Sequence, residues 1–205
     1  MKNILLACLS LILLTSSVLA ADKVNWRRVD AEAKPVAAGD EIAVTYLTGL
    51  PDIDQSTPCY SYSVRLAFDE RDVVLKRNRI DQTRGKGVEE VEVARIPYAS
   101  IKDLLFGYDA AYAAQEGKLA TAQQRYCNSQ NLVMTLQILK SPVAILFEKD
   151  GRPISFVVVA QGDNAVRLYQ GLASRAKLKA KTPLAYKGVV KQRAKLDPPP
   201  PDAER

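Results

Sequence analysis

One run of basic residues inside the chain has the composition to bind an anion. Lys76, Arg77 and Arg79 follow one another closely, and Arg84 and Lys86 come soon after them. Ammonium and guanidinium groups gathered in this way attract phosphates and carboxylates. The same cluster could instead be the exposed end of a hairpin, where charged side chains keep an edge strand soluble. The sequence therefore gives five candidate anion-binding residues and leaves both interpretations open.

The histidine and cysteine content limits the other chemistry. The chain has no histidine, which excludes His-based acid–base catalysis, Ser–His triads and every His metal site. Apart from Cys8 near the N-terminus, the cysteines are Cys59 and Cys127. We expect these two to form a disulfide, which would close a loop of about 69 residues and stabilise the fold by roughly 4 kcal/mol. A reactive thiol pair is the alternative, but it would need a Cys-x-x-Cys motif or an activating neighbour, and the sequence has neither.

Two shorter patterns match known sites only in part. Ser174 and Lys177 form a Ser-x-x-Lys pattern, but the companion motifs of penicillin-recognising enzymes are absent. Residues 52–56 resemble the first half of a calcium loop, but Thr57 stands where such a loop needs a glycine. We therefore expect no catalytic residue, no metal site and no cofactor.

The first 20 residues predict a secretory signal peptide. Lys2 supplies a positive charge, the stretch from Ile4 to Leu14 is almost entirely apolar, and Ala20 is a small residue at the cleavage position. The apolar stretch is too short for a stable membrane span. A lipoprotein box ending at Cys8 is the alternative, but only about four apolar residues precede that cysteine. We expect cleavage after Ala20 and export to the periplasm or the extracellular space.

The positive charge of the mature chain is concentrated at its C-terminus. Residues 177–205 hold eight Lys or Arg and three Asp or Glu, whereas the body from 21 to 176 is neutral. Prolines occupy all four positions from 198 to 201, which favours an extended backbone. The composition predicts a basic, disordered tail over 179–205. Such a tail either makes weak contact with an anionic membrane surface or envelope polymer, or serves only solubility.

Hydropathy between these segments alternates with a period of two. The alternation predicts strands over 41–47, 60–68, 72–79, 88–96, 132–139, 143–149 and 154–160. Asp150 and Gly151 predict a tight hairpin between the last two. Two segments have helical character. Ile101, Leu104 and Leu105 fit one helical turn within 99–106, and the Ala- and Gln-rich stretch 109–128 predicts an inserted helix.

A final amphipathic helix is predicted from Asp163, a good N-cap, to Leu178. Its apolar stripe includes Val166, Tyr169 and Leu172, which places Arg175 on the outer side. Strands followed by a closing helix exclude a parallel α/β sheet. The predicted fold is mainly β with α: a bent antiparallel β-sandwich or barrel of about seven strands capped by a C-terminal helix.

Three parts of the chain resemble the bacterial pleckstrin-homology-like (PH-like) domains. They are the hairpin segment 64–75, the segment 95–104 with its Ile-Pro-Tyr-x-x-Ile pattern, and the 150–151 hairpin that leads into the final helix. The resemblance implies a seven-stranded bent sandwich with one end plugged by the helix, so that the domain spans 41–178 after an N-terminal segment 21–40. It implies a scaffold that binds peptides, lipids or partner proteins and has no activity of its own. The inserted stretch 109–128 departs from a minimal domain of this kind, and the disulfide would attach it to the strand near Cys59.

We therefore expect an exported, non-enzymatic binding or scaffold module that is a monomer. Its partner would be a protein, a peptide or an anionic envelope component, and not a nucleic acid. Two alternatives stay open. One is a cell-envelope accessory protein that acts electrostatically through its basic tail. The other is an unrecognised enzyme, which would need a deep pocket lined with acids of perturbed pKa.

Overall fold

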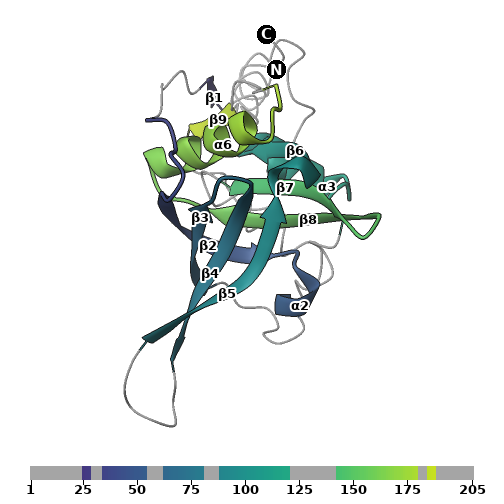
Figure 1. Cartoon of the computed structure of the whole chain (residues 1–205). Helices are drawn as coiled ribbons and strands as arrows, with labels where there is room; N and C mark the ends of the chain where they lie inside the picture. Colours follow the sequence, from purple (N-terminus) through teal and green to yellow (C-terminus); the bar gives the residue numbers. More distant parts are fainter. Residues whose placement is uncertain are drawn as a thin grey trace, which may run out of the picture.

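The computed structural model describes residues 25–28, 34–54, 62–80, 88–120, 142–179 and 184–187. The chain is mainly β with some α, as predicted (Figure 1). In chain order the elements are β1 (Asn25–Arg28), β2 (Glu41–Thr48), α2 (Pro51–Asp54), β3 (Tyr62–Phe68), β4 (Asp72–Ile80), β5 (Val88–Pro97), η1 (Tyr98–Ser100), β6 (Ile101–Phe106), α3 (Tyr108–Gln115), β7 (Pro142–Lys149), β8 (Arg152–Val159), α6 (Asp163–Arg175) and β9 (Leu184–Lys187).

Seven of the strands form one antiparallel sheet in the order β5-β4-β3-β2-β8-β7-β6. Strand β2 pairs with both β3 and β8, so the last strand of the sheet along the chain returns to the first. The two edges are β5 and β6, which are separated in the chain only by η1 but are not paired with each other. The expected antiparallel sheet of seven strands is therefore confirmed, and the sheet is not closed.

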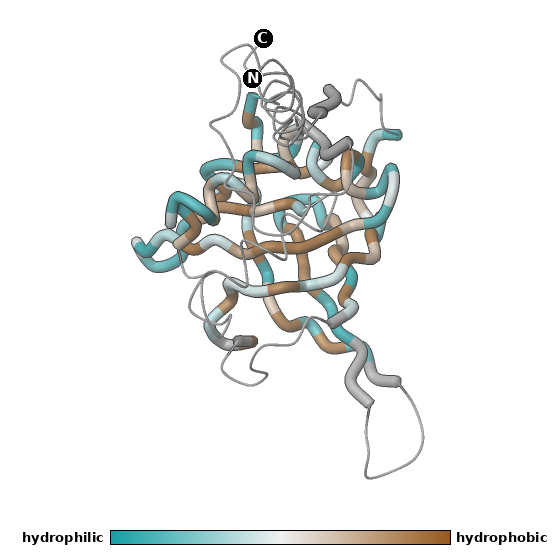
Figure 2. The backbone as a smooth tube through the Cα atoms, turned by 180° about the vertical axis from the view of Figure 1, so that it is seen from behind, coloured by the Kyte–Doolittle hydropathy of each residue, from teal (hydrophilic) through white to brown (hydrophobic). Residues whose placement is uncertain are grey.

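The strands follow the hydropathy pattern that predicted them. In β2 the inward positions Ile42, Val44 and Tyr46 are buried, while the alternate positions Glu41 and Ala43 are exposed. Strands β7 and β8 are instead almost continuously apolar (Figure 2). Both of their faces are covered: one contributes to the main core, and the other packs against the buried alanines of α3 in a second cluster.

The hairpin between β7 and β8 forms where Asp150 and Gly151 predict it. These residues have φ values of 53° and 69°, the left-handed region that a two-residue type I′ turn requires. The turn places Lys149 opposite Arg152, and the register continues along both strands.

Residues 101–106 form strand β6 and not the expected helical turn. The spacing of Ile101 and Leu104 looked helical, but the pairing with β7 contains a bulge between Ile101 and Asp103. The bulge shifts the side-chain alternation by one residue, so buried positions three apart lie on the same face of a strand. The predicted strand 132–139 lies outside the described residues, and β6 supplies the seventh strand of the sheet.

The Ala-rich helix α3 is shorter than the predicted insertion 109–128. It ends at Gln115, and Gly117 follows it with φ +70°. That glycine therefore lies past the C-terminus of the helix, where a left-handed conformation is common, and not in its middle. The part of the predicted insertion beyond Ala120 lies outside the described residues.

Helix α6 confirms the predicted final helix and contributes Val166, Leu168, Tyr169 and Leu172 to the main core. Two details of the prediction were wrong. Asp163 is the first helical residue and not the N-cap, because Gly162, with φ +54°, precedes it and makes the turn into the helix. The helix also ends at Arg175, before Leu178.

The C-terminal tail departs from the prediction at one place. Leu184–Lys187 form strand β9, which pairs antiparallel with β1 (Asn25–Arg28). A partner strand about 160 residues away in the chain supplies backbone hydrogen bonds that local composition cannot reveal. The remainder of the tail from residue 180, and the predicted signal peptide, lie outside the described residues.

Candidate functional site

The first two residues of the predicted basic cluster lie on opposite faces of β4. Lys76 and Arg77 are consecutive strand residues, so their side chains point in opposite directions. Lys76 Nζ lies 2.7 Å from Glu41 Oε1 and 3.6 Å from Glu90 Oε2. The hydrogen bond that Lys76 donates to Glu41 raises the pKa of Lys76 above its usual value. Lys76 is therefore engaged by carboxylates of the chain itself.

Arg77 and Arg79 belong to the projecting end of the β4–β5 ribbon. Strand β3 pairs with β4 only as far as Arg65 opposite Lys76, whereas the β4–β5 pairing continues to Ile80 opposite Val88. The ribbon therefore extends beyond the rest of the sheet (Figure 1). Arg79 has Glu89 as its cross-strand neighbour. Arg84 and Lys86 lie outside the described residues, so anion binding by this cluster stays a prediction.

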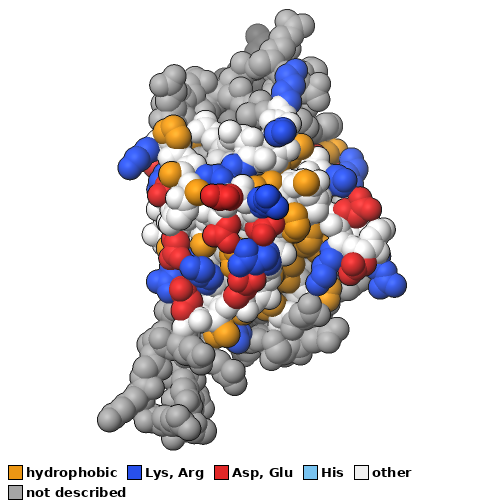
Figure 3. Space-filling model, viewed as in Figure 1, with side chains coloured by type: hydrophobic (Ala, Val, Ile, Leu, Met, Phe, Trp, Pro, Cys, Tyr) orange, Lys and Arg blue, Asp and Glu red, His pale blue; other side chains and the backbone are white. Residues whose placement is uncertain are grey.

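The outer face of β2 to β5 carries an alternating network of charges (Figure 3). Arg65 lies between Glu41, at 3.4 Å, and Glu90, to which it donates a hydrogen bond. Such exposed pairs contribute little individually and weaken as salt is added. The network balances positive and negative groups and so provides no concentrated site for an anion.

A second part of the network surrounds Arg95 on β5. Its guanidinium contacts Glu92 at 2.7 Å, Asp69 at 2.8 Å and Asp72 at 3.3 Å. Hydrogen bonds to these carboxylates raise the pKa of Arg95, and the bond from Arg95 lowers the pKa of Glu92. The network therefore fixes the end of β5 to the β3–β4 turn.

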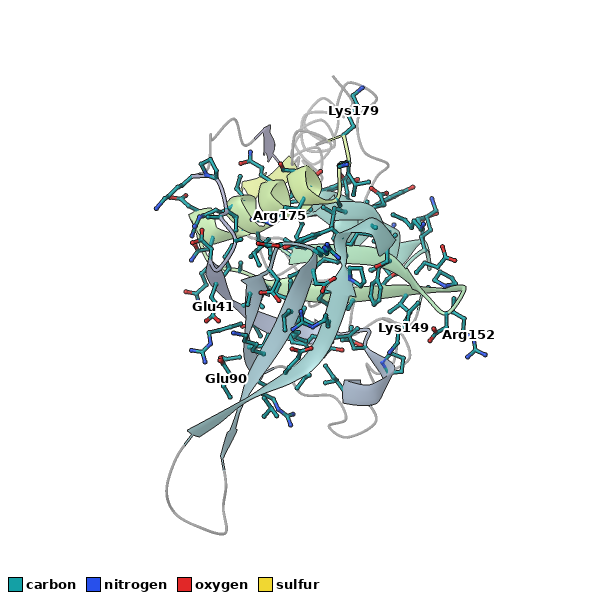
Figure 4. The ribbon with its side chains drawn as sticks, in the orientation of Figure 1. Glu41, Glu90, Lys149, Arg152, Arg175 and Lys179 are labelled. Atoms are coloured by element: carbon teal, nitrogen blue, oxygen red, sulfur yellow. The ribbon has the colours of Figure 1, made fainter. Side chains whose placement is uncertain are left out.

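The most distinctive polar group of the described chain is Arg175, in the last turn of α6 (Figure 4). The prediction placed Arg175 on the outer side of the helix, and this was wrong. Its guanidinium carbon lies 5.5 Å from the centre of the Tyr98 ring and 5.9 Å from that of Phe68. Two aromatic residues from other elements thus hold the cation by cation–π contact.

The hydrogen bonds of Arg175 go to backbone carbonyls. Nη1 donates to Asp69 O at 3.0 Å, and Nη2 donates to Val36 O at 3.2 Å. The third nitrogen, Nε, is buried and has no hydrogen-bond partner among the described residues. No carboxylate in the described part of the chain forms an ion pair with this guanidinium. Arg175 therefore keeps one donor without an acceptor.

The neighbouring residues of α6 hold the segment that precedes β2. Arg167 Nη2 lies 2.7 Å from Asp40 Oδ2, and Arg167 Nε donates to Lys34 O at 3.3 Å. Val36 packs directly on Gly171, so closely that a Cβ atom on that glycine would lie 2.7 Å from Val36 Cγ2. Arg167, Gly171 and Arg175 are spaced by four residues and so share one face of the helix.

Tyr98 completes the surroundings of Arg175. Its hydroxyl donates to Asp69 O at 3.2 Å, the same carbonyl that accepts from Arg175. Burial raises the pKa of Tyr98 to about 12, although the positive charge of Arg175 acts in the opposite direction. Tyr98 is therefore a neutral hydrogen-bond donor at physiological pH.

Sequence reasoning missed the Arg175 site because it sorted helix residues only into apolar and polar. The available signal was the spacing of Arg167, Gly171 and Arg175, with a glycine that leaves room between two long cations. Cys59 and Cys127 lie outside the described residues. Among the residues the structure does describe, no group of three or more metal-ligating side chains is found, and no helix has the length and hydropathy to cross a membrane.

Comparison with known proteins adds no relative: no protein-family model and no curated protein matches this chain.

Proposed function

We propose that the mature chain is an exported, non-enzymatic binding module of PH-like architecture that takes an extended segment of a partner protein. The seven antiparallel strands and the core contacts of α6 support the PH-like reading, in which the helix plugs one end of a bent sheet. A module of this kind acts by presenting a fixed surface to its partner.

The observation that carries the proposal is the free edge of β5. This strand is ten residues long and, within the described sheet, pairs only with β4. An antiparallel edge of this length presents backbone N–H and C=O groups to which an extended segment can add as a further strand. Half-buried Val91 and Val93 provide apolar contact along the same strand.

The charge of β5 indicates the partner's composition. Strand β5 carries the glutamates Glu89, Glu90 and Glu92 and one arginine, Arg95. Ion pairs within the chain already engage Glu90 and Glu92. Such charges on an edge strand discourage indiscriminate pairing with other strands. A segment with Lys or Arg opposite Glu89 would complement its charge, and the main chain of that segment would supply the hydrogen bonds. The engagement of Lys76 by carboxylates favours this protein partner over an anionic polymer.

The test uses the mature chain and two synthetic peptides of alternating lysine and valine, one with its backbone intact and one with proline at every second position. The intact peptide should slow hydrogen exchange of β5 amides, and the proline peptide should not, because it lacks the donors of a strand. Glu89→Lys should weaken binding about tenfold, whereas Glu116→Lys at the exposed end of α3 should leave it unchanged. Equal protection by both peptides, or protection that avoids β5, would refute the proposal.

Export and the Cys59–Cys127 disulfide belong to the same proposal and rest on the sequence. Intact-mass measurement of the protein purified from its native compartment should give an N-terminus at Ala21, and peptide mapping without reductant should recover the two cysteines in one linked fragment. A chain that begins at Met1, or two free thiols, would contradict these expectations without affecting the β5 surface.

A further inference from the structure

Residues 34–37, here called the N-terminal strap, lie across one face of α6. Lys34 O accepts a hydrogen bond from Arg167 Nε at 3.3 Å, and Val36 O accepts one from Arg175 Nη2 at 3.2 Å. Between these two contacts Val36 rests on Gly171. The helix thus holds a short segment by two carbonyls and one aliphatic side chain, a mode that depends little on which protein supplies the segment.

The geometry at Arg175 suits a different acceptor from the one it has. Nε and Nη2 lie on the same edge of a guanidinium, and their N–H bonds run parallel. Val36 O takes the hydrogen bond of Nη2, while Nε stays buried and unpartnered among the described residues. A single carbonyl satisfies one of the two donors, whereas the two oxygens of a carboxylate satisfy both.

The cation is already in position to receive such a group. Nη1 is fixed by Asp69 O, and the rings of Phe68 and Tyr98 flank the guanidinium. A side chain held in this way loses little conformational freedom on binding, which favours affinity. No carboxylate of the described chain neutralises it.

We propose that Arg175 is the centre of a carboxylate-binding site for an extended peptide, and that the N-terminal strap occupies this site within the same chain. The position of the strap's carbonyl groups indicates which end of a peptide would reach Arg175. The strap's carbonyl at position 36 faces Arg175, so a peptide that ended at the residue equivalent to Val36 would place its C-terminal carboxylate on the Nε and Nη2 edge. The ligand is therefore the C-terminus of a partner protein, with a small aliphatic last residue seated on Gly171.

The strap competes with such a ligand because it is tethered to the site. An intramolecular segment acts at a high effective concentration, so the unmodified chain should bind the peptide weakly. Val36→Gly should weaken the hold on the strap, because it removes the side chain seated on Gly171. Gly171→Ala should instead exclude both the strap and a peptide that ends in valine, because the new Cβ would lie 2.7 Å from Val36 Cγ2 and 3.0 Å from Val36 Cβ. Alanine is also favourable in a helix, so this change should not unfold α6.

The experiment follows the Nε–H resonance of Arg175 in the full mature chain by NMR, with Arg175→Lys used to assign it. The probe is acetyl-Lys-Pro-Val with a free C-terminal carboxylate, compared with the same peptide as its amide. In Val36→Gly the acid should bind about tenfold more tightly than in the matched control Ser174→Ala, which changes an exposed position of α6. The amide should bind about tenfold more weakly than the acid, because it lacks the second anionic oxygen.

Two further binding measurements test which kind of carboxylate the site accepts and whether the ligand's last side chain lies on Gly171. A peptide with an internal aspartate and an amidated end, acetyl-Lys-Pro-Asp-Ala-amide, should bind less well than the acid; if it binds equally, the site stands and side-chain carboxylates also fit it. Gly171→Ala should weaken binding of the acid, because its Cβ would occupy the space of the ligand's last side chain. Equal binding of acid and amide would overturn the proposal. So would binding that Arg175→Lys leaves unchanged, followed in that variant by the backbone amide resonance of Gly171. None of these outcomes bears on β5, which is a separate surface.

Discussion

Asp69 O accepts hydrogen bonds from both Arg175 and Tyr98, at 3.0 and 3.2 Å. This one carbonyl, in the turn between β3 and β4, therefore joins the end of α6 to the residue that follows β5. Arg175 and Tyr98 also contact each other directly through a cation–π interaction. The end of the helix, the turn and the end of an edge strand are thus fixed together at a point where, within the described part of the chain, backbone carbonyls and aromatic rings contact the cation.

Replacing Arg175 by glutamate should destabilise the chain by about 2–4 kcal/mol, because charge-assisted hydrogen bonds to two carbonyls and two cation–π contacts are lost. The new carboxylate would also face the carbonyl oxygens of Val36 and Asp69. Ser174→Glu, one residue earlier and exposed, should change stability by no more than about 0.5 kcal/mol. Urea unfolding of both variants provides the measurement. Equal, small effects would mean that the observed contacts of Arg175 contribute nothing to stability.

Leu172→Ala tests whether α6 closes the core. Leu172 is fully buried and belongs to the main cluster, so truncation should cost about 2–5 kcal/mol through lost burial and the cavity that remains. Ser174→Ala on the same helix is the matched control and should be close to neutral. A Leu172→Ala chain that melts at the temperature of the control would separate α6 from the core and remove the support for a PH-like architecture.

The sequence predicted the sheet well where one face of a strand is buried and the other exposed, as in β2. It failed at β6 because a bulge changes the alternation there, so the buried positions Ile101 and Leu104 look helical. It failed at β9 because that strand depends on β1, a partner at the opposite end of the chain. The local hydropathy pattern cannot reveal the bulge or the β1–β9 pairing, because both depend on how strands pair.

The Arg175 site was beyond local reasoning for a similar reason. Its two hydrogen-bond acceptors are main-chain carbonyls, at Val36 and Asp69, that lie 139 and 106 residues away along the chain. Every residue has a carbonyl, so residue type cannot identify which ones an arginine will meet. The basic cluster at 76–79 was conspicuous in composition, yet Lys76 is paired with glutamates that only the sheet register brings near.

Tyr98 should make stability fall in strongly alkaline solution. Its pKa is raised by burial from 10.0 in the unfolded chain to about 12 in the folded chain. Below pH 10 the residue is neutral in both states and its contribution is fully present. Between pH 10 and about 12 the unfolded state loses its proton first, so the free energy of unfolding should decrease.

The comparison for this pH effect is Tyr98→Phe, which retains the ring and the other eight tyrosines of the chain. The difference in unfolding free energy between the two proteins should shrink steadily across that interval. A difference that stays constant from pH 9 to about 12 would show that Tyr98 ionises equally easily in both states.

Lys177→Gly should stabilise the chain. Lys177 follows the end of α6 with φ +56°, and Leu178 N donates to Ala173 O at 2.9 Å, the contact that ends a helix in a Schellman motif. This position favours glycine, because a side chain in the left-handed region costs about 1–2 kcal/mol. Glycine also gives the unfolded chain more freedom, which offsets about 0.4–1 kcal/mol of that relief. The net gain should therefore be about 0.5–1 kcal/mol, seen as a higher urea midpoint with an unchanged slope.

Lys179→Gly is the control. It removes the same charge two residues later, where φ is not positive, and should leave stability unchanged or lower it slightly. A gain that appeared equally in both variants would come from removing a lysine and not from relieving the backbone at residue 177.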